Sequence, residues 1–134
     1  MRQKGFATLE VILMVMVIAI LASIAVPRFS SVTTAANTAK VQSDLSTLDT
    51  AAAIYAMENG NSKATLTISA DLEPYLQDAS SLKPPVGDVY VEDSTGKLTL
   101  TKDDDYKVTK QNDGEYRATL RDKTAGHFKK KEST

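Results

Sequence analysis

The sequence predicts an α+β fold in which one long N-terminal α-helix packs on a small antiparallel β-sheet of about four strands. Three observations predict it. Residues 11–26 are apolar on every helical face, residues 30–58 contain neither Pro nor Gly, and after Pro85 apolar residues alternate with polar ones. A helix stripe and strands with one apolar face are expected to form two packed layers.

The first part of the helix has the length and composition of a membrane span. Apart from Glu10, residues 6–27 carry no charge. About 20 apolar residues cross the hydrocarbon core of a bilayer, and a chain of 134 residues has no interior large enough to enclose such a helix. Arg2 and Lys4 precede the span, so the positive-inside rule places the N-terminus in the cytoplasm and the rest of the chain outside.

A cleavable secretory signal is the alternative for this segment, because Ser23-Ile24-Ala25 has the small residues that signal peptidase accepts. Glu10 argues against it. An acidic side chain costs about 2.5–3.5 kcal/mol at the centre of a membrane helix, so it requires a cationic partner that a signal core does not provide.

Residues 30–58 form the second, amphipathic half of the helix. Pro27 cannot donate to the carbonyl of Ser23, so it either kinks the helix or ends it at the membrane surface. The pattern beyond Pro27 favours continuation, and Asn59-Gly60 is the expected stop. The apolar positions of this half are Val41, Leu45, Leu48, Ala52 and Tyr55.

The remaining chain is predicted to form a loop, a sheet and a tail. Residues 61–85 are expected to form a connecting loop, with a short helix at Ala70–Leu76 capped by Ser69. Turn signals separate four strands, which favours an antiparallel meander covering the helix stripe. Residues 122–134 are expected to fray. The strands centre on Val89 and Val91, on Leu98 and Leu100, on Tyr106 and Val108, and on Tyr116, Ala118 and Leu120.

Composition excludes several kinds of active site. With no Cys there is no disulfide, thiolate nucleophile or cysteine zinc site, and a single His excludes a metal site built from several histidines. A catalytic triad would depend on His127, which we interpret as a solvated side chain in a polar tail. We therefore expect no enzyme and no cofactor.

Two clusters of charge are candidate binding sites. Asp103, Asp104 and Asp105 offer oxygen ligands for Ca²⁺, but three consecutive carboxylates lack the alternating spacing of a calcium loop, which favours a solvated turn. A locally basic C-terminus is the candidate for DNA or another polyanion, with a solubilising tail as the alternative. Its residues are Arg117, Arg121, Lys123, Lys129, Lys130 and Lys131.

The run Lys4-Gly5-Phe6-Ala7-Thr8-Leu9-Glu10, followed by the apolar segment, resembles the class III signal of type IV pilins and pseudopilins. Ala7 stands where that family more often has Thr. The resemblance implies cleavage by prepilin peptidase between Gly5 and Phe6 and methylation of the new Phe6 amine. It also implies that Glu10 pairs with the amine of a neighbouring subunit, and that the helix near Pro27 melts in the filament.

The resemblance divides the chain into a leader at 1–5, a filament-core half-helix at 6–27, an amphipathic half-helix at 28–59, a globular head at 60–121 and a basic tail at 122–134. It implies a subunit that polymerises with copies of itself. The implied partners are the peptidase, an inner-membrane assembly platform with a cytoplasmic ATPase, and minor pilins. The subunit would move from the cytoplasmic membrane to a cell-surface filament.

Two other functions remain open from the sequence. One is a major pseudopilin of a type II secretion or competence (DNA-uptake) machine. The other is a monomeric binding module, anchored in the membrane by an uncleaved helix.

Overall fold

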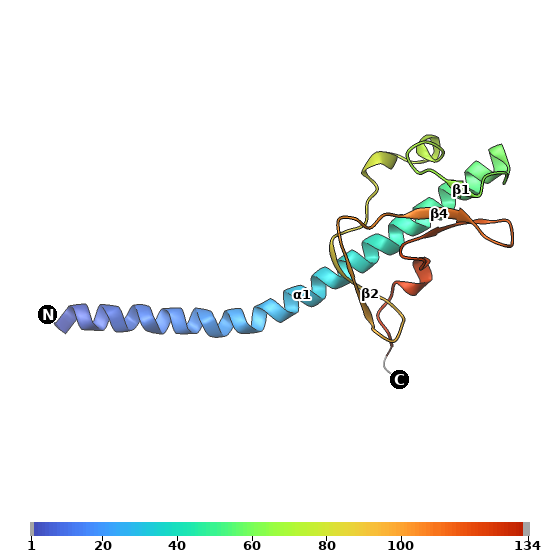
Figure 1. Ribbon diagram of the computed structural model, residues 1–134. Helices are drawn as coiled ribbons and strands as arrows, with labels where there is room; N and C mark the ends of the chain where they lie inside the picture. Colours follow the sequence, from blue (N-terminus) through green and yellow to red (C-terminus); the bar gives the residue numbers. More distant parts are fainter. Residues whose placement is uncertain (1, 133–134) are drawn as a thin grey trace. The chain divides into compact units, whose positions relative to one another are not determined.

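The structure, a computed structural model, describes residues 2–132 (Figure 1). A single long helix, α1 (Arg2–Asn59, 58 residues), contains Pro27 and continues beyond it, so the alternative of a helix end at Pro27 is wrong. The chain divides into two compact units between Thr33 and Thr34, and α1 has residues in both. The α+β fold, with a long N-terminal helix packed on antiparallel strands, is confirmed.

The first unit consists of helix alone. None of the described side chains between residues 3 and 33 is buried. Its apolar residues are widely exposed, as Phe6 at 71%, Ile18 at 64% and Val26 at 67% illustrate. A lone helix that is apolar on all sides cannot bury its own surface, so this unit requires an apolar environment supplied from outside the monomer.

The second unit contains two antiparallel sheets. In the first, β4 (Lys107–Lys110) lies between β1 (Thr65–Leu66) and β5 (Tyr116–Thr119). In the second, β2 (Gly87–Tyr90) pairs with β3 (Lys97–Leu100). The register places apolar residues opposite one another, with Leu66 facing Val108 and Val89 facing Leu98.

The predicted helix stripe forms the centre of this unit's core. Val41, Leu45, Leu48 and Ala52 are 0% exposed, and Tyr55 packs at the edge. Each fully buried Val or Leu side chain contributes about 1.5–3 kcal/mol of hydrophobic free energy. From the strands and the segments that flank them, the core takes Val89, Val91, Leu100, Tyr106, Val108, Tyr116, Ala118 and Leu120.

Polar side chains on the same helix satisfy strand backbone groups. The Thr38 hydroxyl accepts a hydrogen bond from the Tyr90 amide at 2.8 Å, and the Asp49 carboxylate accepts one from the Ala118 amide at 2.7 Å. The Asn37 side-chain amide donates to the Asp88 carbonyl at 3.2 Å. The helix therefore occupies strand edges that would otherwise leave unpaired backbone groups.

The helix ends where the sequence predicts. Gly60 follows Asn59 with φ +75°, and its amide donates to the Ala56 carbonyl at 2.9 Å. Such a left-handed residue satisfies a carbonyl of the last turn, and glycine adopts it without a Cβ penalty.

The four predicted strands are present, but the single meander is wrong. β3 and β4 do not pair, and β4 pairs instead with β1, which lies in the segment predicted as a loop. Thr65-Leu66-Thr67-Ile68 carries the alternation of a strand, and Leu66 is buried at 3% exposure. The segment between β3 and β4 is held instead by Asp104, whose carboxylate accepts a hydrogen bond from the Thr101 amide at 2.7 Å.

The predicted helix at Ala70–Leu76 is also wrong. Only a 3-10 turn, η1 (Glu73–Tyr75), forms there, and its N-cap is Leu72 rather than Ser69. Pro74 explains the difference, since an α-helix over this stretch would need an amide at that position to donate to the Ala70 carbonyl. A second 3-10 turn, η2 (Ala79–Ser81), follows.

The first part of the C-terminal segment does not fray. A third 3-10 turn, η3 (Ala125–His127), places Phe128 in the core at 0% exposure. The Glu92 amide donates to the His127 carbonyl at 2.8 Å, which ties the segment to the end of β2. Residues 122–128 are thus part of the folded unit, and the basic tail begins at Lys129.

Phe128→Ala is expected to lower the free energy of unfolding of the second unit by about 3–5 kcal/mol, because it leaves a cavity the size of a phenyl ring. Denaturant unfolding of the full chain in detergent, followed by tyrosine circular dichroism, measures this. Lys131→Ala is the control and should change stability by no more than about 0.5 kcal/mol. Equal effects of the two substitutions would contradict the place of Phe128 in the core.

Candidate functional site

The residues of the predicted processing site lie on one exposed stretch of α1. Phe6 and Glu10 are four residues apart, so they share a helical face. A Cβ placed on Gly5 meets no atom within 4 Å. The fold therefore does not demand glycine at position 5, and a requirement for glycine there would have to come from a protein that reads this segment.

Glu10 is a carboxylate on an apolar surface. It borders a shallow groove along the helix with Leu13, Met14, Val17 and Ile18. Among the described side chains, none forms an ion pair or hydrogen bond with Glu10. The carboxylate is thus available to a cation from outside the described chain.

The helix surface around Glu10 is suited to an apolar environment such as the interior of a lipid bilayer. Within residues 2–132, one helix is long and apolar enough to cross a membrane, and the apolar stretch of α1 has a mean hydropathy of 2.8 with none of it buried. Serine and threonine hydroxyls in this half return to the helix backbone, as from Thr8 to the Lys4 carbonyl at 2.9 Å and from Ser23 to the Ile20 carbonyl at 2.7 Å. Their polar groups are therefore satisfied without water.

The three carboxylates predicted as a calcium alternative do not act together. Asp104 faces the Arg121 guanidinium, with Nε and Nη2 at 2.6 and 2.9 Å from its two oxygens. This charge-assisted pair, together with the Thr101 amide, lowers the pKa of Asp104 to about 2. Asp103 and Asp105 are exposed, and within residues 2–132 no group of three His, Cys, Asp or Glu is arranged to hold a metal ion. The arrangement of these carboxylates therefore does not support a calcium site.

The six basic residues predicted as a polyanion patch are largely neutralised by partners. Arg121 pairs with Asp104, and Arg117 pairs with Glu115 at 3.1 Å. Lys123 lies 3.0 Å from Asp93, whose pKa is lowered by the Thr95 hydroxyl and by this lysine. Lys129 lies 3.0 Å from Glu92. The positions therefore do not form one continuous basic face, and only Lys129, Lys130 and Lys131 follow one another on the surface.

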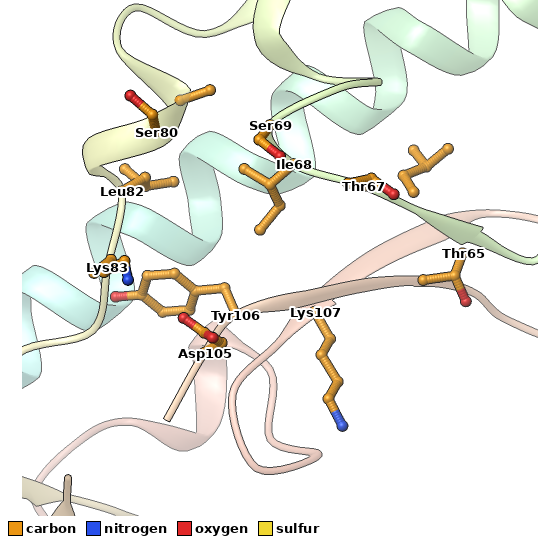
Figure 2. A pocket seen from close by; sticks show the side chains of 12 residues that line it. Thr65, Thr67, Ile68, Ser69, Ser80, Leu82, Lys83, Asp105, Tyr106 and Lys107 are labelled. Carbon is orange, nitrogen blue, oxygen red and sulfur yellow. The ribbon is translucent and has the colours of Figure 1, made fainter. Parts of the chain in front are cut away.

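A depression of about 370 Å³ opens beside β1 (Figure 2). Figure 2 shows Thr65, Thr67 and Ile68 along one side and Lys107 extending away from them. The Tyr106 hydroxyl donates to Asp44 on α1 at 2.7 Å, and burial raises the pKa of Tyr106. Among the described residues, no Ser or Thr hydroxyl that lines the depression forms a hydrogen bond with an Asp or Lys side chain that also lines it.

His127 is exposed, with its Nδ1 3.0 Å from the Thr124 hydroxyl. That contact stabilises the turn η3. Within residues 2–132, no Ser or Asp side chain forms the hydrogen bonds of a catalytic triad with it.

Comparison with protein-family models, with curated proteins and with solved structures found no match to this chain. The fold and the exposed apolar half of α1 define only a broad class of protein. This is an α+β protein with a long N-terminal helix that could span a membrane and a separately compact unit built on the second half of that helix.

The Asp104–Arg121 pair predicts an acid-dependent loss of stability. The pKa of Asp104 in the folded chain is below its ordinary value of 3.8, so the pair stabilises the fold above that value and loses its effect as the pH falls toward about 2. Asp104→Asn should therefore lower stability at neutral pH and flatten the loss between pH 3.8 and about 2.

Denaturant unfolding at several pH values measures this effect. Asp103→Asn is the matched control and should keep the parent's profile, because this neighbouring carboxylate is exposed and forms no ion pair with another described residue. An Asp104→Asn variant as acid-sensitive as the parent would contradict the assignment.

Proposed function

We propose that the chain is a structural subunit of a type IV pilus-like filament, which is cleaved between Gly5 and Phe6, methylated on Phe6 and polymerised through its N-terminal helix. The observation that carries the proposal is the carboxylate of Glu10, one helical turn from Phe6 on the exposed half of α1, which is otherwise apolar from Phe6 to Pro27. The proposed activity is assembly, not catalysis.

Cleavage would supply the cation that Glu10 lacks. Removal of residues 1–5 leaves an ammonium group on Phe6 at the start of the helix. In an apolar medium of low dielectric constant, an unpaired carboxylate is costly, whereas a carboxylate next to an ammonium is strongly attracted to it. Glu10 of an incoming subunit would therefore select the position at which it meets the Phe6 amine of a subunit already in place, which sets the register of the polymer.

The exposed apolar half of α1 supports the same proposal. It needs an apolar environment at every stage, first lipid and then the helices of other subunits. Moving such a helix between two apolar environments costs little hydrophobic free energy, because neither state exposes it to water. The assembly machinery then has to supply only the free-energy difference between the helix in lipid and the helix in the filament.

The second unit suits the outer surface of such a filament. Its core is complete without the first unit, because all the buried apolar residues of the core come from positions 41–128, on α1, on the five strands and on the segments that flank and connect them. It can therefore stay folded while the apolar half of the helix changes its surroundings.

Glu10→Ala should leave processing intact but reduce filament formation. A hydrogen-bonded charged pair contributes about 1.5–3 kcal/mol, so losing it should lower the equilibrium constant for adding each subunit about tenfold or more. Electron microscopy and quantitation of sheared surface material measure filament yield, and mass spectrometry of the membrane fraction measures cleavage.

Thr8→Ala, on the same helical segment, is the control for this experiment and should assemble normally. Normal filaments from the Glu10→Ala variant would refute the assembly role of Glu10. A protein that is inserted but stays monomeric in the parent sequence would favour the anchored binding module instead.

A further inference from the structure

The described chain carries a lysine cluster at one place on the second unit, formed by Lys97, Lys129, Lys130 and Lys131. All four side chains are exposed. The Lys97 ammonium lies 5.8 Å from the centre of the Tyr90 ring, and Lys129 pairs with Glu92 at 3.0 Å. Within residues 2–132, the side chains of Lys130 and Lys131 form no ion pair or hydrogen bond.

Two lysines of the cluster, Lys129 and Lys130, border a shallow groove of about 280 Å³, which Tyr90 also lines. One side of the groove is α1, through Ala35, Thr38, Ala39 and Gln42, and the other side is Tyr90 and residues 128–130. Phe128 is buried in the core at 0% exposure, and it directly precedes Lys129. The lysine run therefore begins at a fixed position on the second unit.

The groove is built on the earliest part of α1 that belongs to the second unit. Only eight residues separate Val26, the end of the apolar run, from Ala35 in the groove. A stretch this short spans at most about 30 Å, so it tethers the groove to the leaflet from which α1 emerges. The headgroup layer of that leaflet is about 5–8 Å thick, and its anionic groups attract lysines that come within the Debye length of about 8 Å at physiological ionic strength.

We propose that the lysine cluster and its groove bind anionic phospholipid headgroups of the leaflet from which α1 emerges, and hold the second unit at the membrane until the subunit enters a filament. This rests on the membrane-inserted state in the proposed function. Glu92 and Glu132 lie among the lysines and leave an excess of two positive charges. That excess gives a weak, salt-sensitive contact, which assembly can break.

A phospholipid surface fits these observations better than a nucleic acid does. The membrane helix would keep the cluster at a high effective concentration of headgroups, whereas a soluble polyanion has no such tether. Binding of single-stranded nucleic acid also requires aromatic rings on which bases stack. The Tyr90 ring near the cluster is already occupied by the Lys97 ammonium, which lies over it.

The test uses the full chain reconstituted into vesicles of phosphatidylcholine, with and without phosphatidylglycerol. Because the chain has no Cys, Ala39→Cys gives a single site for a nitroxide label in the groove. Collision of the label with a water-soluble relaxation agent measures its exposure, and vesicle flotation measures insertion. We expect the equilibrium constant for the protected state to be about 30-fold larger with phosphatidylglycerol, as two net charges predict.

The double substitution Lys130→Glu/Lys131→Glu should abolish this protection, as should salt at about 1 M, where the Debye length is about 3 Å. Lys102→Glu/Lys107→Glu makes the same change in net charge away from the groove and should keep it. Equal exposure in both kinds of vesicle, or loss of protection in both double variants, would overturn the proposal. So would protection by duplex DNA without protection by phosphatidylglycerol.

The outcome separates this proposal from the one on which it rests. If the protein floats with both kinds of vesicle but shows no lipid-dependent protection, the headgroup contact is refuted, whereas the membrane-inserted helix and the proposed filament assembly are not. Failure to float with either removes the membrane-inserted state and the headgroup contact together.

Discussion

The proposed function depends on the free-energy cost of holding one carboxylate, that of Glu10, in an apolar environment. Glu10 is the only charge between Phe6 and Pro27, and no described side chain neutralises it. A helix intended only as a membrane anchor would be more stable with an apolar residue at this position. Keeping the carboxylate there makes physical sense if a cation joins it, and in the proposed function that cation is the ammonium that cleavage would form on Phe6.

The rest of the molecule is consistent with that constraint. In the first unit none of the described side chains of α1 is buried, and between Phe6 and Pro27 the surface is apolar except at Glu10, so the stability of this half-helix depends on its surroundings. In the second unit the same helix supplies both the apolar stripe and the polar groups that bind strand edges, through Thr38 and Asp49. The second unit thereby owes its fold to contacts within itself, and this allows one helix to serve two environments.

Much of this architecture could be predicted from the sequence, where the pattern was long and regular. The stripe from Val41 to Ala52 spans several helical turns, and its burial follows from helical periodicity alone. The helix end at Gly60 follows from local backbone chemistry. The four strands after Pro85 each carry enough alternation to be recognised.

The failures lie where a short segment depends on distant contacts. β1 has only two residues, and its pairing with β4 is decided about forty positions further along the chain. Phe128 is a single apolar residue in a polar stretch, so its burial could not be inferred from periodicity. The pairing of Arg121 with Asp104 likewise needs the folded chain, whereas Pro74 was a readable local signal against a helix at Ala70–Leu76.

The central claim is that Glu10 meets a newly formed ammonium group, and the intact mass of the native protein extracted from membranes tests it most directly. The account predicts a chain that begins at Phe6, lacks residues 1–5 and carries one additional methyl group on its amine. A native chain that retains Met1 and the residues up to Gly5 would contradict it, since no ammonium would then form beside Glu10.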